Sequence, residues 1–231
     1  MLKAVVFDLD DTLFPEYEFV WSGFQAVSDW VATKYALTGF FEVAWQFFQQ
    51  GNRNNIFNLA LEKLRVEYET DVIQELVQIY RQHKPTISLY EDAKWAIAYF
   101  KNYQLGMITD GYLLTQQNKV EALGIEPSFD AIIYSDAYGR ENWKPSPLPY
   151  QKIMNLLQCS GKECVYIADN PSKDFVTANT LDWMTVQICR VHGEYSKILS
   201  KKSHEAKFKI QSLLELKNII PTNAIGLLHD F

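Results

Sequence analysis

Two aspartates near the start of the chain have the spacing needed for covalent catalysis. The apolar run AVVF at residues 4–7 leads directly into DLDDT at residues 8–12. Burying bare carboxylates is costly, so a strand that delivers them to one place needs compensating cations there. Asp8 could attack a metal-bound phosphorus atom and form an aspartyl-phosphate, while Asp10 could handle the proton of the leaving group. The pattern therefore indicates phosphoryl chemistry at Asp8.

Polar residues that end later apolar runs supply the other groups. They are Thr109, Asp110 and Gly111 in QLGMITDG, Lys144 in NWKPSPLPY, and Asp169 and Asp174 in VYIADNPSKD. Asp8 and Asp169, with backbone and water oxygens, would make an all-oxygen site suited to Mg²⁺. Phosphate binding is predicted at Thr109, at the amides around Gly111, which include that of Asp110, and at Lys144. Asp11 is expected to be a solvated or capping carboxylate outside the site.

The elements that must position these residues alternate between strands and helices. Five apolar runs have the length and branched composition of buried strands, at residues 3–8, 104–111, 130–136, 163–170 and 183–189. Helical patterns lie between them at 91–102, 113–124 and 148–161, and a further strand–helix unit is expected at 206–220. This alternation predicts an α/β fold with a Rossmann-like parallel sheet flanked by helices. Ligands bind at the carboxyl ends of such strands, so the polar residues should converge.

One segment contains only helical patterns and predicts a small all-helical cap domain. Its helices are expected at residues 16–37, 39–50, 55–66 and 70–83. The predicted division is a catalytic core of residues 1–14 and 86–231 and a cap of residues 15–85. The many aromatic residues of the cap are expected to pack its helices. Arg53, in the break GNRNN, is a candidate to hold a second anionic or hydroxyl group of the substrate.

Composition restricts the partners of the protein. The 231 residues include 22 Lys and Arg against 28 Asp and Glu, which gives a net charge of −6 and argues against a nucleic-acid polymer or an acidic membrane. The first apolar run is too short for a secretory signal, and no run has the length of a membrane helix. A cytoplasmic protein, monomeric or homodimeric, is expected.

Taken together, these motifs resemble those of the haloacid dehalogenase-like hydrolases, in the phosphatase branch with a helical cap inserted after the first strand. The first motif of that family, D-x-D-x-T, matches residues 8–12. Its second motif, a Ser or Thr ending a hydrophobic strand, matches Thr109 in MITDG, and its third, a lysine before proline, matches Lys144. The fourth, two acids after another hydrophobic strand, matches Asp169 and Asp174.

The resemblance implies a role for each matching residue. Asp8 would be the nucleophile, and Asp10 the general acid and then the general base. Thr109 and Lys144 would bind the phosphoryl oxygens, and Lys144 would also steady Asp8. The implied Mg²⁺ ligands are Asp8, the backbone carbonyl of Asp10, Asp169 and, directly or indirectly, Asp174.

The leading hypothesis is a Mg²⁺-dependent phosphatase acting on a small phosphomonoester of the sugar phosphate or nucleoside monophosphate class. A phosphomutase could use the same aspartyl-phosphate intermediate, and a non-catalytic regulatory module could bind Mg²⁺ and phosphate without turnover. A 2-haloacid dehalogenase would not need an acid two residues after the nucleophile, because halide leaves without a proton. Neither G-x-G-x-x-G after the first strand nor a P-loop occurs, which disfavours dinucleotide oxidoreductases and nucleotide-driven motors.

Overall fold

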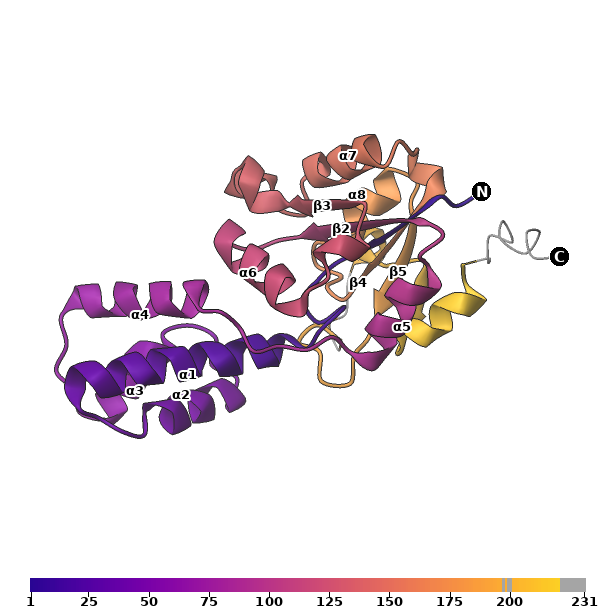
Figure 1. Ribbon diagram of the computed structural model, residues 1–231. Coiled ribbons are helices and arrows are strands. Elements are labelled where there is room, and N and C mark those ends of the chain that lie inside the picture. The colour runs from indigo at the N-terminus through magenta and orange to yellow at the C-terminus, as the bar shows by residue number, and fades with distance from the viewer. Residues whose placement is uncertain (197, 199–200, 221–231) are drawn as a thin grey trace. The chain divides into compact units, whose positions relative to one another are not determined.

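A six-stranded parallel sheet forms the core of the computed structural model, which describes residues 1–196, 198 and 201–220 (Figure 1). Its strands are β1 (Ala4–Phe7), β2 (Gln104–Thr109), β3 (Ala131–Tyr134), β4 (Cys164–Ala168), β5 (Met184–Ile188) and β6 (Phe208–Ile210). Every neighbouring pair is parallel, in the order β3-β2-β1-β4-β5-β6. The predicted α/β class with a parallel sheet flanked by helices is therefore confirmed.

The strand order places β1 at the centre, between β2 and β4. Ala4 is opposite Gln104 on one side and Cys164 on the other. All residues of β1 and β4 are buried, which explains why both read as continuous apolar runs. The chain winds outward in two directions from β1, through β2 to β3 and through β4 to β6. In such sheets the crevice for ligands opens beyond the carboxyl ends of the strands at which the order reverses.

Helices pack against the faces of the sheet. They are α5 (Glu91–Tyr99), α6 (Leu113–Leu123), α7 (Pro147–Leu156) and α8 (Phe175–Thr180). Tyr150 and Ile153 of α7 and Phe175 of α8 pack with Val6 and Tyr166 on one face of the sheet, and α5 lies on the other side in Figure 1. Short 3₁₀ helices occupy residues 126–128, 135–138, 140–142, 161–163, 202–204 and 213–218.

The strand–helix unit expected at 206–220 is shorter than its pattern suggested. It consists of β6 and a 3₁₀ helix, Leu213–Asn218, that begins with a capping box formed by Ser212 and Glu215. Leu213 and Leu216 are the buried residues of this 3₁₀ helix, and their spacing of three suits the eclipsed side chains of a 3₁₀ turn. Residues 221–231 of the predicted core lie outside the described residues.

The chain divides into two compact units, residues 1–16 with 88–231, and residues 17–87. The second contains α1 (Glu16–Tyr35), α2 (Phe40–Gln49), α3 (Ile56–Lys63) and α4 (Thr70–Gln82), apart from the first residue of α1. It has its own apolar core, in which Phe24 contacts the rings of Trp45, Phe57 and Tyr80. The aromatic residues of this helical unit thus pack its helices together, as expected. Within the described part of the chain, no helix has the length and apolar character needed to cross a membrane.

A largely buried ion pair links α5 to residues 190 and 212–213 and yields a stability prediction. Asp92 accepts hydrogen bonds from Arg190 Nη1 at 2.7 Å, Ser212 Oγ at 2.9 Å and the amide of Leu213 at 2.9 Å. Burial alone would raise the pKa of Asp92, but Arg190 and the backbone and hydroxyl donors hold that pKa below its usual range. This carboxylate therefore stabilises the fold above the unfolded pKa of about 3.9, and the contribution disappears as the pH falls through the folded pKa.

We expect Asp92→Asn to lower the free energy of unfolding at pH 7 by about 2 kcal/mol, because charged hydrogen bonds are lost. The difference from wild type should shrink as the pH falls below about 4. Urea unfolding between pH 7 and pH 3 measures both effects. Asp29→Asn, at an exposed position on α1, is the matched control. A loss of stability that is the same at every pH would contradict the role of the Asp92 charge.

Candidate active site

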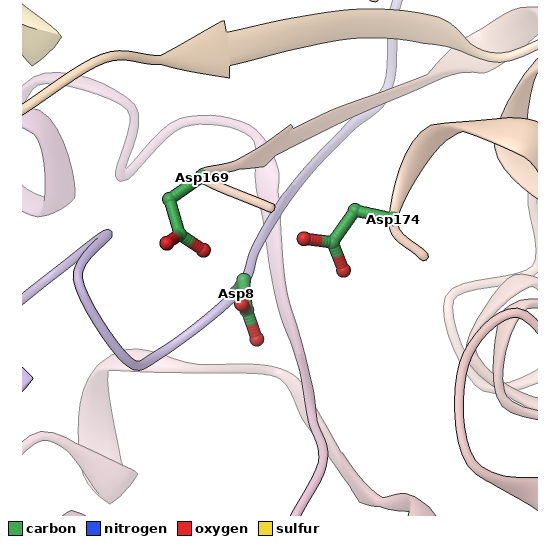
Figure 2. Close-up of side chains that lie close together, drawn as sticks. All are labelled: Asp8, Asp169 and Asp174. Carbon is green, nitrogen blue, oxygen red and sulfur yellow. The ribbon is translucent and has the colours of Figure 1, made fainter. Parts of the chain in front are cut away.

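Three buried aspartates from distant parts of the chain meet at the carboxyl ends of β1 and β4. Oxygens of Asp8, Asp169 and Asp174 all lie within 4.8 Å of one another, and Figure 2 shows these carboxylates around a common space. The amide of Asp8 donates to the carbonyl of Ile167 at 2.9 Å, which extends the β1–β4 ladder one residue past the strand. Sheet register thus brings Asp8 beside the loop that carries the other two aspartates.

Lys144 is buried against two of these aspartates. Its ammonium lies 2.8 Å from Oδ1 of Asp8 and 2.8 Å from Oδ1 of Asp174, and it donates to the Tyr166 hydroxyl at 3.0 Å. Burial would lower the pKa of Lys144, but Asp174 and Asp8 raise it well above its ordinary value, so the side chain is a cation. Lys144 therefore fixes the orientation of Asp8, and its three contacts match the three protons of an ammonium.

One lysine does not compensate three carboxylates. Burial, followed by the charges of Asp8 and Asp174, raises the pKa of Asp169 well above its usual range. Burial also raises the pKa of Asp8 to about 6, although Lys144 opposes this and Asp174 adds to it. The Asp169 side chain is only 5% exposed and accepts no hydrogen bond from any of the described residues. A hard divalent cation fits these three carboxylates, because it would supply both the missing charge and the missing partner of Asp169.

Asp10 lies apart from this cluster and is held by α6. Its Oδ1 lies 2.6 Å from the ammonium of Lys119, and its Oδ2 accepts from the amide of Gln116 at 2.9 Å. Lys119 also contacts Glu16 at 3.1 Å. Burial would raise the pKa of Asp10, but Lys119, Glu16 and Gln116 lower it to about 2. Sequence reasoning missed Lys119 and Gln116, because a lysine and a glutamine on a helix ordinarily face solvent.

Thr109 and Gly111 lie beside Gln116, one of the residues that hold Asp10. Thr109 is fully buried, and its hydroxyl accepts from Nε2 of Gln116 at 2.5 Å. Gly111 has a φ of +138°, and a Cβ there would lie 2.9 Å from Oε1 of Gln116. Glycine at this position therefore permits both the backbone conformation and the close approach of the Gln116 carboxamide.

Asp110 has both carboxylate oxygens occupied by protein donors. Ser135 Oγ donates to Oδ1 at 2.5 Å, the amide of Lys144 donates to Oδ1 at 3.1 Å, and the ammonium of Lys173 contacts Oδ2 at 3.1 Å. An anion cannot itself attract phosphate, so any contribution of Asp110 to phosphate binding would come from its backbone amide. The carboxylate instead holds the Lys144 loop and Lys173 in place. Lys173 is a further cation that sequence reasoning missed.

A cavity of about 160 Å³ is lined both by Asp8 and Asp169 of the aspartate cluster and by Asp10. Of the ten described residues that line it, seven are acidic and one, Lys173, is a lysine. Asn170 and Tyr195 complete the lining. The excess of acidic groups is the strongest electrostatic reason for a bound cation in this cavity.

Asp11 and Arg53 each have hydrogen-bond partners within their own unit. Asp11 adopts a φ of +50° and accepts from the amides of Glu16 at 3.0 Å and Glu194 at 3.1 Å, so it caps two backbone segments as expected. Arg53 lies in the helical unit, where Nη1 donates to the carbonyls of Phe48 and Asn52, each at 3.0 Å. Its role with substrate stays a prediction.

Curated proteins of similar sequence are phosphatases. The glyceraldehyde 3-phosphate phosphatase of Methanocaldococcus jannaschii is 28% identical over 232 residues, which cover 95% of this chain and 97% of that protein. The human N-acylneuraminate-9-phosphatase is 27% identical over 191 residues, which cover 75% of this chain and 76% of that protein.

Solved structures share the fold. YfnB of Bacillus subtilis is described as a HAD-hydrolase bound to magnesium. It superposes with a TM-score of 0.67 at 17% identity, over 96% of this chain and 99% of that one. L-2-haloacid dehalogenase of Xanthobacter autotrophicus superposes with a TM-score of 0.60 at 22% identity, over 95% and 98%. At such identities the likeness establishes the fold alone. The family model described as haloacid dehalogenase-like hydrolase matches residues 5–188, and because this range is most of the chain, the protein belongs to the haloacid dehalogenase-like hydrolases.

Proposed function

We propose that the protein is a Mg²⁺-dependent phosphatase that hydrolyses a small phosphomonoester through an aspartyl-phosphate on Asp8. Its reaction class is phosphoric monoester hydrolysis, in keeping with the phosphatases among its relatives. The observation that carries the proposal is the position of Asp8, which Lys144 orients beside Asp169 and Asp174 while Asp10 lines the same cavity. An acid two residues from the nucleophile serves an alkoxide leaving group and has no use in expelling halide.

In the first step, an oxygen of Asp8 attacks phosphorus as the bond between phosphorus and the ester oxygen breaks. Asp10 must be protonated in the substrate complex, and it then transfers this proton to the departing oxygen. Lys144 keeps Asp8 oriented, and the Thr109 hydroxyl donates to a phosphoryl oxygen. In the second step, Asp10 takes a proton from water, which attacks phosphorus and releases phosphate from Asp8. Asp8, Asp169, Asp174 and the Asp10 carbonyl would hold Mg²⁺, which when bound neutralises charge on the phosphoryl oxygens.

The phosphatases among the relatives and the predicted cap support a small substrate. Small sugar phosphates or nucleoside monophosphates are the proposed substrates, and the helical unit would close over them to exclude water. Arg53 would then contact the part of the substrate beyond the phosphate. A cytoplasmic location and a monomeric or dimeric state remain predictions.

Removal of the metal provides the direct test. We expect EDTA to reduce phosphate release from a panel of phosphorylated metabolites by at least about 10³-fold, because a bound metal supplies several kcal/mol of transition-state stabilisation. Added Mg²⁺ should restore the rate. Inorganic phosphate is measured directly, and the isomerised sugar phosphate and halide from a 2-haloacid are measured in parallel.

The parallel measurements separate the alternatives. Isomerised product without free phosphate would identify a phosphomutase, and halide release would identify a dehalogenase. Mg²⁺ binding without turnover of any substrate would identify a regulatory module. Phosphate release unaffected by EDTA would contradict the metal-dependent mechanism.

A further inference from the structure

We propose that the loop after β5, residues 190–196, recognises the substrate, and that Tyr195 on this loop forms a hydrogen bond with a hydroxyl group of the leaving group. The substrates would then be phosphomonoesters of neutral, hydroxylated compounds, and esters with a second anionic group would be disfavoured. This inference rests on the proposed function, because it concerns the substrate of the same cavity. Tyr195 and its neighbour Glu194 belong to none of the four sequence motifs, yet both line the cavity that contains Asp8.

The loop is built from consecutive tight turns. The amide of Gly193 donates to the carbonyl of Arg190 at 3.1 Å, and the amide of Ser196 donates to the carbonyl of Gly193 at 3.3 Å. The Ser196 hydroxyl donates to the same carbonyl at 2.9 Å. The amide of Ile198 donates to the carbonyl of Tyr195 at 3.1 Å. Amide-to-carbonyl bonds between residues three apart define tight turns, so the backbone that carries Tyr195 has a specified conformation.

Two longer contacts attach the loop to the residues that follow β1. Nη2 of Arg190 donates to the carbonyl of Thr12 at 2.7 Å, and the amide of Glu194 donates to Oδ2 of Asp11 at 3.1 Å. Arg190 is 8% exposed, and its Nη1 donates to Asp92 at 2.7 Å. Because Asp11 and Thr12 belong to the first motif, these contacts fix the loop relative to the proposed nucleophile.

The Tyr195 hydroxyl is near the cavity and has no hydrogen-bond partner among the described residues. Burial raises the pKa of Tyr195, and the charges that also act on this pKa are those of Glu194, Lys173, Asp169 and Glu16. All four of these residues line the cavity, so the phenolic oxygen lies close to the charged groups of its wall. A tyrosine hydroxyl that is partly buried ordinarily has a partner, and it can both donate and accept. A hydroxyl group of the substrate would provide that partner.

The charges around Tyr195 disfavour a second anion on the substrate. The Glu194 charge acts on both Asp11 and Tyr195, which places it on the same part of the wall. Among the described residues of the lining, Lys173 is the one basic side chain, and its ammonium pairs with Asp110 at 3.1 Å. Carboxylates accept hydrogen bonds from hydroxyl groups and repel other anions. This part of the wall therefore suits a hydroxylated leaving group.

Removal of the Tyr195 hydroxyl tests the contact. Glycerol 3-phosphate carries hydroxyl groups on its leaving group, and propyl phosphate has the same carbon chain without them. At saturating Mg²⁺, we expect Tyr195→Phe to lower kcat/KM about 5- to 10-fold for glycerol 3-phosphate and less than about 2-fold for propyl phosphate, since one hydrogen bond is lost. Tyr99→Phe is the matched control and should match wild type, because the Tyr99 ring stacks on Trp95 of α5. An equal loss for both esters, or no loss for either, would overturn the proposal.

A carboxylate on the substrate tests the charge of the wall. In 3-phosphoglycerate, a carboxylate replaces the terminal CH₂OH group of glycerol 3-phosphate. We expect kcat/KM of the wild-type protein to be at least about 10-fold lower for 3-phosphoglycerate, and Glu194→Gln should reduce this ratio about 3-fold or more, because one repelling charge is removed. A wild-type value for 3-phosphoglycerate that equals or exceeds the value for glycerol 3-phosphate would contradict the inference, as would an unchanged ratio in Glu194→Gln.

Binding measurements separate this inference from the proposed function. If the wild-type protein hydrolyses none of the three esters, the proposed function fails on its own, and titration calorimetry at saturating Mg²⁺ still tests the contact. Weaker binding of glycerol 3-phosphate, but not of propyl phosphate, to Tyr195→Phe than to wild type supports the inference. Equal affinities of the two proteins for glycerol 3-phosphate, or no binding of this ester to wild type, overturn it.

Discussion

Asp8→Asn is expected to lower phosphate release by at least about 10⁴-fold, the range found when a catalytic nucleophile is removed. An amide has nearly the shape of a carboxylate but cannot form the acyl-phosphate bond. The substitution should leave the fold intact. Burial raises the pKa of Asp8 to about 6 despite the attraction of Lys144, so ionisation of Asp8 lowers the stability of the fold, and this cost is fully present above about pH 6. A neutral amide avoids this cost, and the free energy of unfolding without Mg²⁺ should not fall.

Asp11→Asn is the matched control for this variant. Asp11 lines the same cavity and carries the same charge, but its oxygens cap backbone amides. Asparagine tolerates the left-handed conformation at this position, with its φ of +50°. Turnover of Asp11→Asn should stay within about 10-fold of wild type, since the lost cap is a modest structural effect. Steady-state phosphate release is measured for Asp8→Asn and Asp11→Asn. Near-normal turnover of Asp8→Asn would show that Asp8 is not the nucleophile.

Lys144→Met should lower both stability and activity. The substitution leaves Asp8 and Asp174 buried without their ammonium partner, and breaking a buried ion pair costs about 3–5 kcal/mol. Because Lys144 orients the nucleophile, turnover should fall by about 10²-fold or more. Added Mg²⁺ should stabilise the variant more than it stabilises wild type, since the ion would replace part of the missing positive charge.

Urea unfolding with and without Mg²⁺ measures these effects. Lys94→Met is the control, because Lys94 pairs with Glu91 at 2.6 Å on the surface, where both side chains are more than half exposed. Exposed pairs contribute about 0–1 kcal/mol, so this variant should unfold almost as wild type does. Equal losses in the free energy of unfolding of Lys144→Met and Lys94→Met would contradict the large cost expected for breaking the buried pair.

Strand ends were the most predictable part of the site. Asp8 and Asp169 follow apolar runs, and parallel sheets gather the carboxyl ends of their strands, so sequence alone indicated that these residues meet. The identity of the nearest partners was less accessible. Lys144 was expected to bind phosphate and to steady Asp8, and its ammonium does lie 2.8 Å from Asp8. Its equally close contact with Asp174 was not expected.

The residues on α6 could not have been found by the same reasoning. Lys119 and Gln116 occupy a helix whose pattern does not reveal which face turns toward Asp10, and pairing at a sequence separation of more than a hundred residues leaves no local signal. Asp110 was similarly ambiguous, because its partners Ser135 and Lys173 come from other loops. Local patterns identified the elements, whereas the contacts between side chains depended on how those elements pack.

The central place of β1 in the sheet has a consequence for folding during synthesis. The two neighbours of β1 begin at residues 104 and 164, so β1 has no partner strand until synthesis has passed residue 104. Contacts of such long separation form slowly, and an apolar strand left exposed in the meantime invites aggregation. Residues 17–87 have a core of their own and can condense during that interval. A chain that ends before β4 would lack Asp169 and Asp174, so the three-aspartate cluster cannot form until both residues have been added.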